Sequence, residues 1–250
     1  MEPHFISGIH NYCDRWCERC SFSQRCEIFA EEQKLTTAQR DPDNPAFWDF
    51  ISNNFRKAME MLEAWAAKEG IDMEAGGEGA CQQPAREGLP PKQQALENLA
   101  QEYTRRTVDW LKANRRAFHE RDEELRRQLQ LGIDVHKQGV QLADAVEVAQ
   151  WYCTMIASKT GRALHSYEHM DEWYWDNPVQ SDANGTAKVA LLCIERSLGA
   201  WLAIRQHLPA KADEVVDMLV LLDKLHRGLM YYFPDAKKFV RPGFDEPGMR

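Results

Sequence analysis

The sequence predicts an all-α fold: an antiparallel four-helix bundle with an additional N-terminal helix and a cysteine-rich metal-binding cap. Apolar residues recur at three- and four-residue spacing through most of the chain, and no segment shows the period-two alternation of a β-strand. Four of the 7 cysteines lie between positions 13 and 26. These observations distinguish a helical body from a thiol-rich N-terminus.

Composition divides the chain into segments at residues 1–40, 41–70, 71–92 and 93–250. The first segment carries the clustered cysteines and is expected to bind metal. The second is a helix that we expect to pack on the bundle: Asp43 or Asn44 caps it, Pro45 occupies its first turn and Gly70 ends it. The third is a linker because it is rich in glycine and proline. The fourth is the bundle.

The bundle segment contains four long periodic stretches, which predict helices at residues 93–131, 133–166, 182–207 and 212–233. Asp182 is the expected cap of the third helix, and a turn at Pro209 precedes the fourth. The first and second helices are joined by only a few residues, as are the third and fourth. Such short connections make each pair antiparallel neighbours.

Charge and hydropathy exclude several classes of function. The 250 residues include 39 acidic and 31 basic side chains, a net charge of −8 that disfavours contact with nucleic-acid phosphates. The richest apolar run, residues 215–222, is interrupted by Asp217 and is too short to span a membrane. The N-terminus lacks the basic and apolar regions of a signal peptide. We therefore expect a cytoplasmic protein whose partner is a protein or a small-molecule ligand.

The clustered cysteines, Cys13, Cys17, Cys20 and Cys26, have the spacing C-x3-C-x2-C-x5-C. Four thiolates satisfy either tetrahedral Zn²⁺ or the irons of a cubane cluster. Closely spaced cysteines in one loop favour a [4Fe–4S] cluster, with Zn²⁺ as the alternative. Two alternatives lack metal: burial of the first three thiols on one face of a continuous helix, or pairing of the four as disulfides.

Residues 17–26 resemble the C-x2-C-x5-C element of the WhiB-like iron–sulfur regulators. The resemblance covers about ten residues and implies only that this spacing can hold a cluster. The chain lacks the family's glycine–tryptophan turn and basic tail, and Cys13 lies nearer than the family's remaining ligand. Residues 13–20 also match the cysteine spacing of radical-SAM enzymes, but the helical pattern excludes the βα barrel that those enzymes need.

Polar residues on apolar helix faces predict a second metal site, formed by Glu147, Glu195, Asp223 and His226. Glu195 and the Asp223-x-x-His226 pair lie at similar distances from the Pro209 turn, so an antiparallel hairpin would bring them to one level. Ferritin-like proteins build di-iron or di-manganese sites from such residues. The alternative is a core histidine bonded to a buried carboxylate, without metal.

These patterns give one leading function and two alternatives. The leading function is a metal-binding helical-bundle protein, holding a [4Fe–4S] cluster, with a redox or sensing role. The first alternative is an oxidoreductase, in which a ferritin-like di-metal site in the bundle activates oxygen. The second is a zinc-stapled protein-interaction module without catalysis. No nucleophile or catalytic residue is identified.

Overall fold

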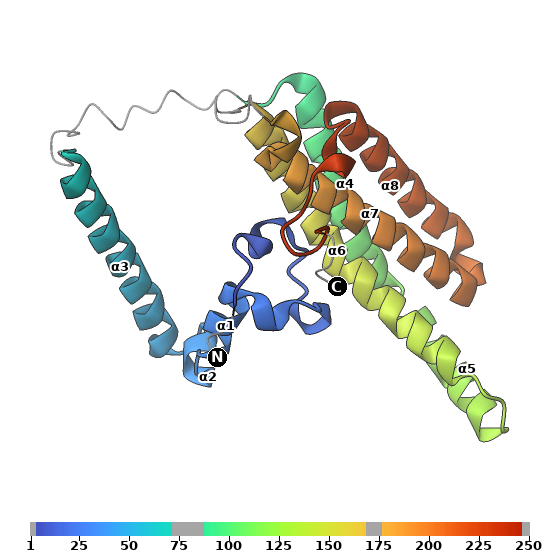
Figure 1. The fold of residues 1–250 in the computed structure, drawn as a ribbon. Coiled ribbons are helices and arrows are strands. Elements are labelled where there is room, and N and C mark those ends of the chain that lie inside the picture. The colour runs from blue at the N-terminus through green and yellow to red at the C-terminus, as the bar shows by residue number, and fades with distance from the viewer. Residues whose placement is uncertain (1–3, 72–87, 169–176, 247–250) are drawn as a thin grey trace. The chain divides into compact units, whose positions relative to one another are not determined.

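The computed structural model describes residues 4–71, 88–168 and 177–246, which contain helices and no strand (Figure 1). The all-α prediction is confirmed for these residues. The α-helices are α1 (Glu27–Gln33), α2 (Thr37–Arg40), α3 (Pro45–Glu69), α4 (Pro91–Ala113), α5 (Arg115–Gln130), α6 (His136–Glu168), α7 (Asp182–His207) and α8 (Ala212–Tyr232). Short 3₁₀-helices are η1 (Ile9–Tyr12), η2 (Cys17–Arg19), η3 (Ser23–Arg25), η5 (Pro178–Gln180), η6 (Pro209–Lys211) and η7 (Ala236–Lys238). None of the described helices is long and apolar enough to cross a membrane.

The chain forms two compact units, and one boundary between them lies inside the cysteine segment. The N-terminal unit comprises Met1–Phe5 and Cys17–Gly88, and the helical unit comprises Ile6–Trp16 and Leu89–Arg250. The sequence places its first division near residue 40 instead. The cysteines beyond residue 16 therefore share a unit with α1, α2 and α3.

Helix α3 of the N-terminal unit has the bounds that the sequence predicts. The side chain of Asn44 accepts a hydrogen bond from the N–H of Ala46 at 3.0 Å, and Pro45 is the first helical residue. Gly70 ends the helix with a φ of 70°, a conformation that glycine adopts without strain. Several large apolar side chains of α3 are exposed, namely Phe55, Met59, Leu62 and Trp65. Packing of this helix on the bundle stays a prediction.

The four long helices of the helical unit share one apolar core. Helix α6 packs against α4 and α7, and α8 packs against the same two helices (Figure 1). Each contributes fully buried side chains: Tyr103 from α4, Ile156 and Leu164 from α6, Ile194 and Trp201 from α7, and Leu222 and Leu225 from α8. Helix α7 is buried on several faces, and its N-terminal half positions the segment that carries Cys13.

Helix α7 begins at the predicted residue but with a different cap. The hydroxyl of Ser181 accepts a hydrogen bond from the N–H of Asn184 at 3.3 Å, so Ser181, rather than Asp182, is the cap. The Asp182 carboxylate instead accepts hydrogen bonds from the Tyr12 hydroxyl, at 3.2 Å, and from the Arg162 guanidinium. This carboxylate therefore links α6 and α7 to η1, the 3₁₀-helix that precedes Cys13.

The single helix predicted at residues 93–131 is wrong, because the structure breaks it at Asn114 into α4 and α5. The Asn114 side-chain amide donates to the carbonyl of Trp110 at 3.0 Å and to the Glu214 carboxylate at 3.4 Å. The Trp110 indole N–H donates to the same carboxylate at 2.7 Å. A buried asparagine that bonds backbone and a neighbouring helix interrupts α-helical geometry.

The segment after α8 is fastened to α7 through Asp245. Its carboxylate lies 2.7 Å from Lys188 Nζ and 3.0 Å from the Arg241 guanidinium. Burial alone would raise the pKa of Asp245, but hydrogen bonds from Arg241 and Lys188 outweigh burial and hold this pKa well below its usual value of 3.8. The ionised carboxylate is therefore the form that stabilises the fold.

The substitution Asp245→Asn should lower the free energy of unfolding by about 1.5–3 kcal/mol at pH 7, because it removes charge-assisted hydrogen bonds. The folded-state pKa lies below the unfolded value, so the stabilisation is complete above about pH 5 and is lost as the pH falls below 4. Urea denaturation at pH 7 and pH 3 should show the gap between wild type and variant shrinking. The Asp217→Asn substitution, at an exposed position of α8, is the control, and equal gaps at both pH values would contradict the expectation.

Candidate functional site

The backbone of the cysteine segment turns repeatedly rather than forming one helix. Three short 3₁₀-helices, η1, η2 and η3, divide it, and Arg15 has a positive φ of 57°. The alternative in which Cys13, Cys17 and Cys20 share one face of a continuous helix is therefore wrong. The four cysteines of the segment are half-buried and form no disulfide bond in the structure, so the disulfide alternative is not found either.

Cys13 lies in the helical unit, at the end of η1. Its thiol donates to the carbonyl of His10 at 3.4 Å, and the backbone N–H of Arg15 donates to its sulfur. Burial raises the pKa of the Cys13 thiol, whereas the Arg15 amide and the positive charges of Arg15 and Lys159 oppose that rise. The thiol is consequently protonated at neutral pH. The Arg15 amide and the positive charges of Arg15 and Lys159 already lie near the position where a thiolate would form.

The other three cysteines of the cluster lie in the N-terminal unit, on successive turns. The N–H of Cys20 bonds the carbonyl of Cys17 at 3.2 Å, and the N–H of Cys26 bonds that of Ser23 at the same distance. The backbone N–H of Phe22 donates to the sulfur of Cys20 at 3.4 Å. Cys13 and Cys20 therefore share a local pattern, in which the amide two residues later donates to the sulfur. Hydrogen bonds of this kind tune the thiolate ligands of metal centres.

Asp14, next to Cys13, anchors this stretch of chain to α6 and α7. Its carboxylate accepts a hydrogen bond from the Tyr152 hydroxyl at 2.7 Å and pairs with the Arg196 guanidinium. Its backbone carbonyl accepts from the Trp151 indole at 3.0 Å. The guanidinium of Arg196 also donates to the Tyr152 hydroxyl at 2.5 Å, so the three groups form a closed network. We call Asp14, Tyr152 and Arg196 the clamp.

Aromatic packing and a lysine reinforce the clamp. The ring of Trp16 stacks on that of Trp151 with centroids 5.2 Å apart and meets Tyr152 edge-on at 5.6 Å. Lys159 Nζ, mostly buried on α6, donates to the carbonyl of Asn11 at 3.3 Å. The ring of Trp16 therefore lies against α6. The chain around Cys13 is thus fixed before any metal binds.

The described part of the chain does not assemble a ligand set for a metal. Within the described ranges, no three His, Cys, Asp or Glu side chains are grouped so that they could hold an ion. Cys13 belongs to one compact unit and Cys17, Cys20 and Cys26 to the other. Joint ligation by these four cysteines stays a prediction.

The residues predicted for the second metal site are dispersed. His226 Nε2 lies 3.9 Å from Glu195 Oε1, which also pairs with Lys237 at 3.0 Å. Asp223 pairs with Arg227 at 2.8 Å, and Glu147 lies on α6 beside a groove between that helix and α4–α5. The expected inward orientation is wrong for Glu195, whose side chain is 45% exposed, and His226 lies at the edge of the core with 29% exposure. The Glu195 and Asp223 carboxylates therefore pair with cations at the surface.

Comparison with protein-family models, with curated proteins and with solved structures finds no match to this chain in any of the three. Its function must therefore be argued from its own residues.

The clamp is the feature of this site that sequence reasoning missed. Tyr152 and Arg196 lie far along the chain from Asp14. The residues on either side of each follow an ordinary helical pattern, so nothing in the sequence marks them as partners of Asp14. The one available signal was Asp14 itself, an acidic residue between two cysteines. Its partners become evident only when α6 and α7 are packed side by side.

Proposed function

We propose that this chain is a metal-binding protein whose Cys13, Cys17, Cys20 and Cys26 ligate a [4Fe–4S] cluster with a redox or sensing role. The proposal includes a finer description of the fold, in which α4, α6, α7 and α8 form an antiparallel four-helix bundle and the cysteine segment is its N-terminal cap. The observation that carries the proposal is the repeated amide-to-sulfur hydrogen bond, to Cys13 and to Cys20, in a segment built of short turns.

The chemistry of the segment suits thiolate ligation. Thiolates are soft donors, and amides that point at sulfur stabilise their negative charge. Lys159 and Arg15 add positive charge near Cys13. The thiols are reduced and half-buried, so they are accessible to an incoming metal. The buried Cys153 and Cys193, in contrast, lie in the apolar core of the helical unit, where burial raises the thiol pKa, to about 12 for Cys193.

The Asp14 network supports a role beyond folding the N-terminus. It joins the residue beside Cys13 directly to α6 and α7. A change in a ligand bound at Cys13 would therefore be transmitted through Asp14 to the core helices. A redox or sensing function requires a connection of this kind. A zinc staple that only folds the N-terminus would need no such attachment.

Metal analysis tests the proposal. Anaerobically purified protein should contain about four iron atoms and about four acid-labile sulfides per chain and absorb broadly in the visible range. Individual Cys→Ser substitutions at positions 13, 17, 20 and 26 should abolish this content, whereas Cys153→Ala should retain it. Colourless protein with one zinc and no sulfide would overturn the cluster and favour the interaction module. Protein that binds neither metal would overturn both.

A further inference from the structure

A groove lies between α4–α5 and α6, next to the break at Asn114. Its volume is about 580 Å³, within the range of small-molecule sites in proteins. The floor is apolar and formed by side chains from the three helices: Val108, Leu111, Phe118, Leu125, Leu142 and Val146. Leu125 and Leu142 are buried, and the others are half-buried.

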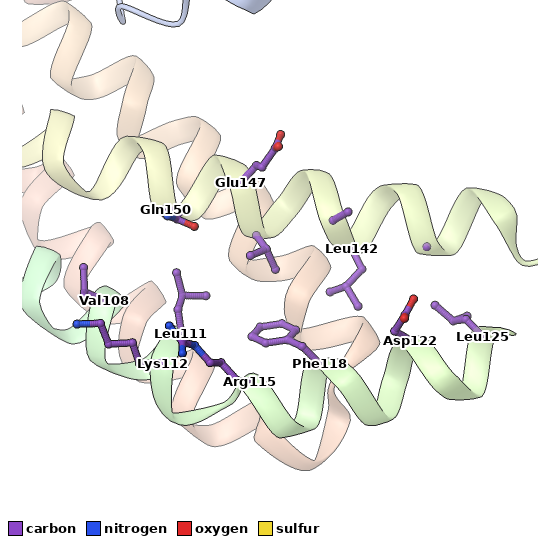
Figure 2. Close-up of a pocket in the computed structure, with 13 residues that line it drawn as sticks. Val108, Leu111, Lys112, Arg115, Phe118, Asp122, Leu125, Leu142, Glu147 and Gln150 are labelled. Carbon is purple, nitrogen blue, oxygen red and sulfur yellow. The ribbon is translucent and has the colours of Figure 1, made fainter. Parts of the chain in front are cut away.

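Two cations lie at one end of this groove. Figure 2 shows Lys112 and Arg115 near Val108, with Gln150 opposite them on α6, while Asp122 lies at the far end near Leu125. Asp122 is already paired, since its carboxylate is 2.8 Å from Arg126. The carboxylate of the remaining acid, Glu147, is directed away from α5 in the same view.

These two cations differ from most of the other basic residues of α4 and α5. Five arginines there pair with a carboxylate within one turn of the same helix: Arg105, Arg106, Arg116, Arg121 and Arg126. Lys112 and Arg115 form no hydrogen bond or ion pair with any residue that the structure describes. In a chain of net charge −8, unpaired cations at the end of an apolar groove complement an anion.

We infer that this groove binds an amphipathic carboxylate with a single unbranched alkyl chain, such as a fatty acid. The carboxylate pairs with Lys112 and Arg115, and Arg115 offers a planar fork that matches carboxylate geometry. The alkyl chain lies over Phe118, Val146 and Leu142. A single flexible alkyl chain can follow the row of apolar side chains that line the groove along α4–α5 and α6.

Side chains next to the groove are tied to the neighbouring helix α8 at the break between α4 and α5. Glu214 of α8 accepts hydrogen bonds from both Trp110 and Asn114, on the side of α4 that faces the core. The ring of Trp110 meets that of Phe118 edge-on, with centroids 5.8 Å apart. Phe118, one of the side chains that line the groove, therefore packs against a tryptophan that is hydrogen-bonded to α8.

Calorimetric titration of the full-length protein with octanoate, decanoate and dodecanoate, below their micelle concentrations, tests the inference. Each added methylene should tighten binding about fourfold while the chain still fits the floor. The double substitution Lys112→Gln with Arg115→Gln should weaken dodecanoate binding at least tenfold and leave dodecanol binding unchanged. The matched control, Arg106→Gln with Arg116→Gln, removes two paired cations and should leave both affinities unchanged.

Several outcomes would overturn the inference. They are no saturable binding of dodecanoate, affinity that does not depend on chain length, or equal weakening by the test and control variants. Sedimentation analysis adds another: a dimer that the Lys112→Gln/Arg115→Gln variant dissociates would show that a second copy occupies the groove instead. Metal content plays no part in these measurements, so their failure would leave the cluster proposal unaffected.

Discussion

Replacing Trp201 by alanine should lower the free energy of unfolding by about 3–5 kcal/mol, the largest single-residue effect that we expect in this protein. The Trp201 side chain is fully buried in α7, and its ring meets that of Trp110 edge-on, with centroids 5.0 Å apart. Its indole N–H donates to the hydroxyl of Tyr103 at 2.9 Å. The alanine variant leaves a large cavity and removes the donor to a buried hydroxyl.

Variants at neighbouring positions separate the contributions to this effect. Trp201→Phe keeps an aromatic ring and removes the N–H, so it should cost about 1–3 kcal/mol. Leu202→Ala is the matched control, because the next residue of α7 is 47% exposed, and it should change stability by less than about 0.5 kcal/mol. Urea denaturation followed by circular dichroism measures all three. Midpoints for Trp201→Ala and Leu202→Ala that agree would contradict the packing described for α7.

The second large effect is expected at the clamp, where Asp14→Ala should cost about 1.5–3 kcal/mol. The substitution removes the acceptor of the Tyr152 hydroxyl and the partner of Arg196. Arg196 is about half exposed, so solvent screens part of the charge interaction and the full cost of a buried ion pair does not apply. The exposed Asp109→Ala substitution on α4 is the control.

Two further measurements distinguish the clamp from a general loss of stability. A double-mutant cycle of Asp14→Ala with Arg196→Met should give a coupling energy of about 0.5–3 kcal/mol, as expected for groups in one network. Amide hydrogen exchange in residues 9–16 should accelerate more than exchange in the core of α7, because the segment loses its attachment locally. Additive effects and unchanged exchange in residues 9–16 would show that Asp14 does not hold this segment.

Local signals in the sequence were sufficient to place helix ends. Asn44, Pro45 and Gly70 bound α3, and α7 and α8 have nearly the predicted limits. Caps, prolines and left-handed glycines act through their immediate backbone neighbours, so their effect can be read without tertiary structure. The break at Asn114 could not be read in this way, because it depends on Glu214, which lies 100 residues later.

The orientation of helices was harder to predict than their limits. Glu195 was expected on an apolar face of α7, but the fully buried side chains of this helix include Leu191, Ile194, Trp201 and Ile204. Helix α7 contacts α6 and α8 on different sides, so apolar residues occur around much of its circumference. The spacing of apolar residues is therefore compatible with more than one choice of buried face. The same ambiguity placed Glu195 in the core and suggested the second metal site.

The sequence by itself determined that the described chain is all-α, where most helices begin and end, and that thiols concentrate in a short N-terminal segment. Tertiary structure decided which residues hold Cys13 in place, which cations remain unpaired and where a groove opens. The physical reason is the range of the interactions. Helix limits depend on neighbours a turn away, but the clamp joins Asp14 to Tyr152 and Arg196, and Asn114, at the break between α4 and α5, bonds Glu214 of α8.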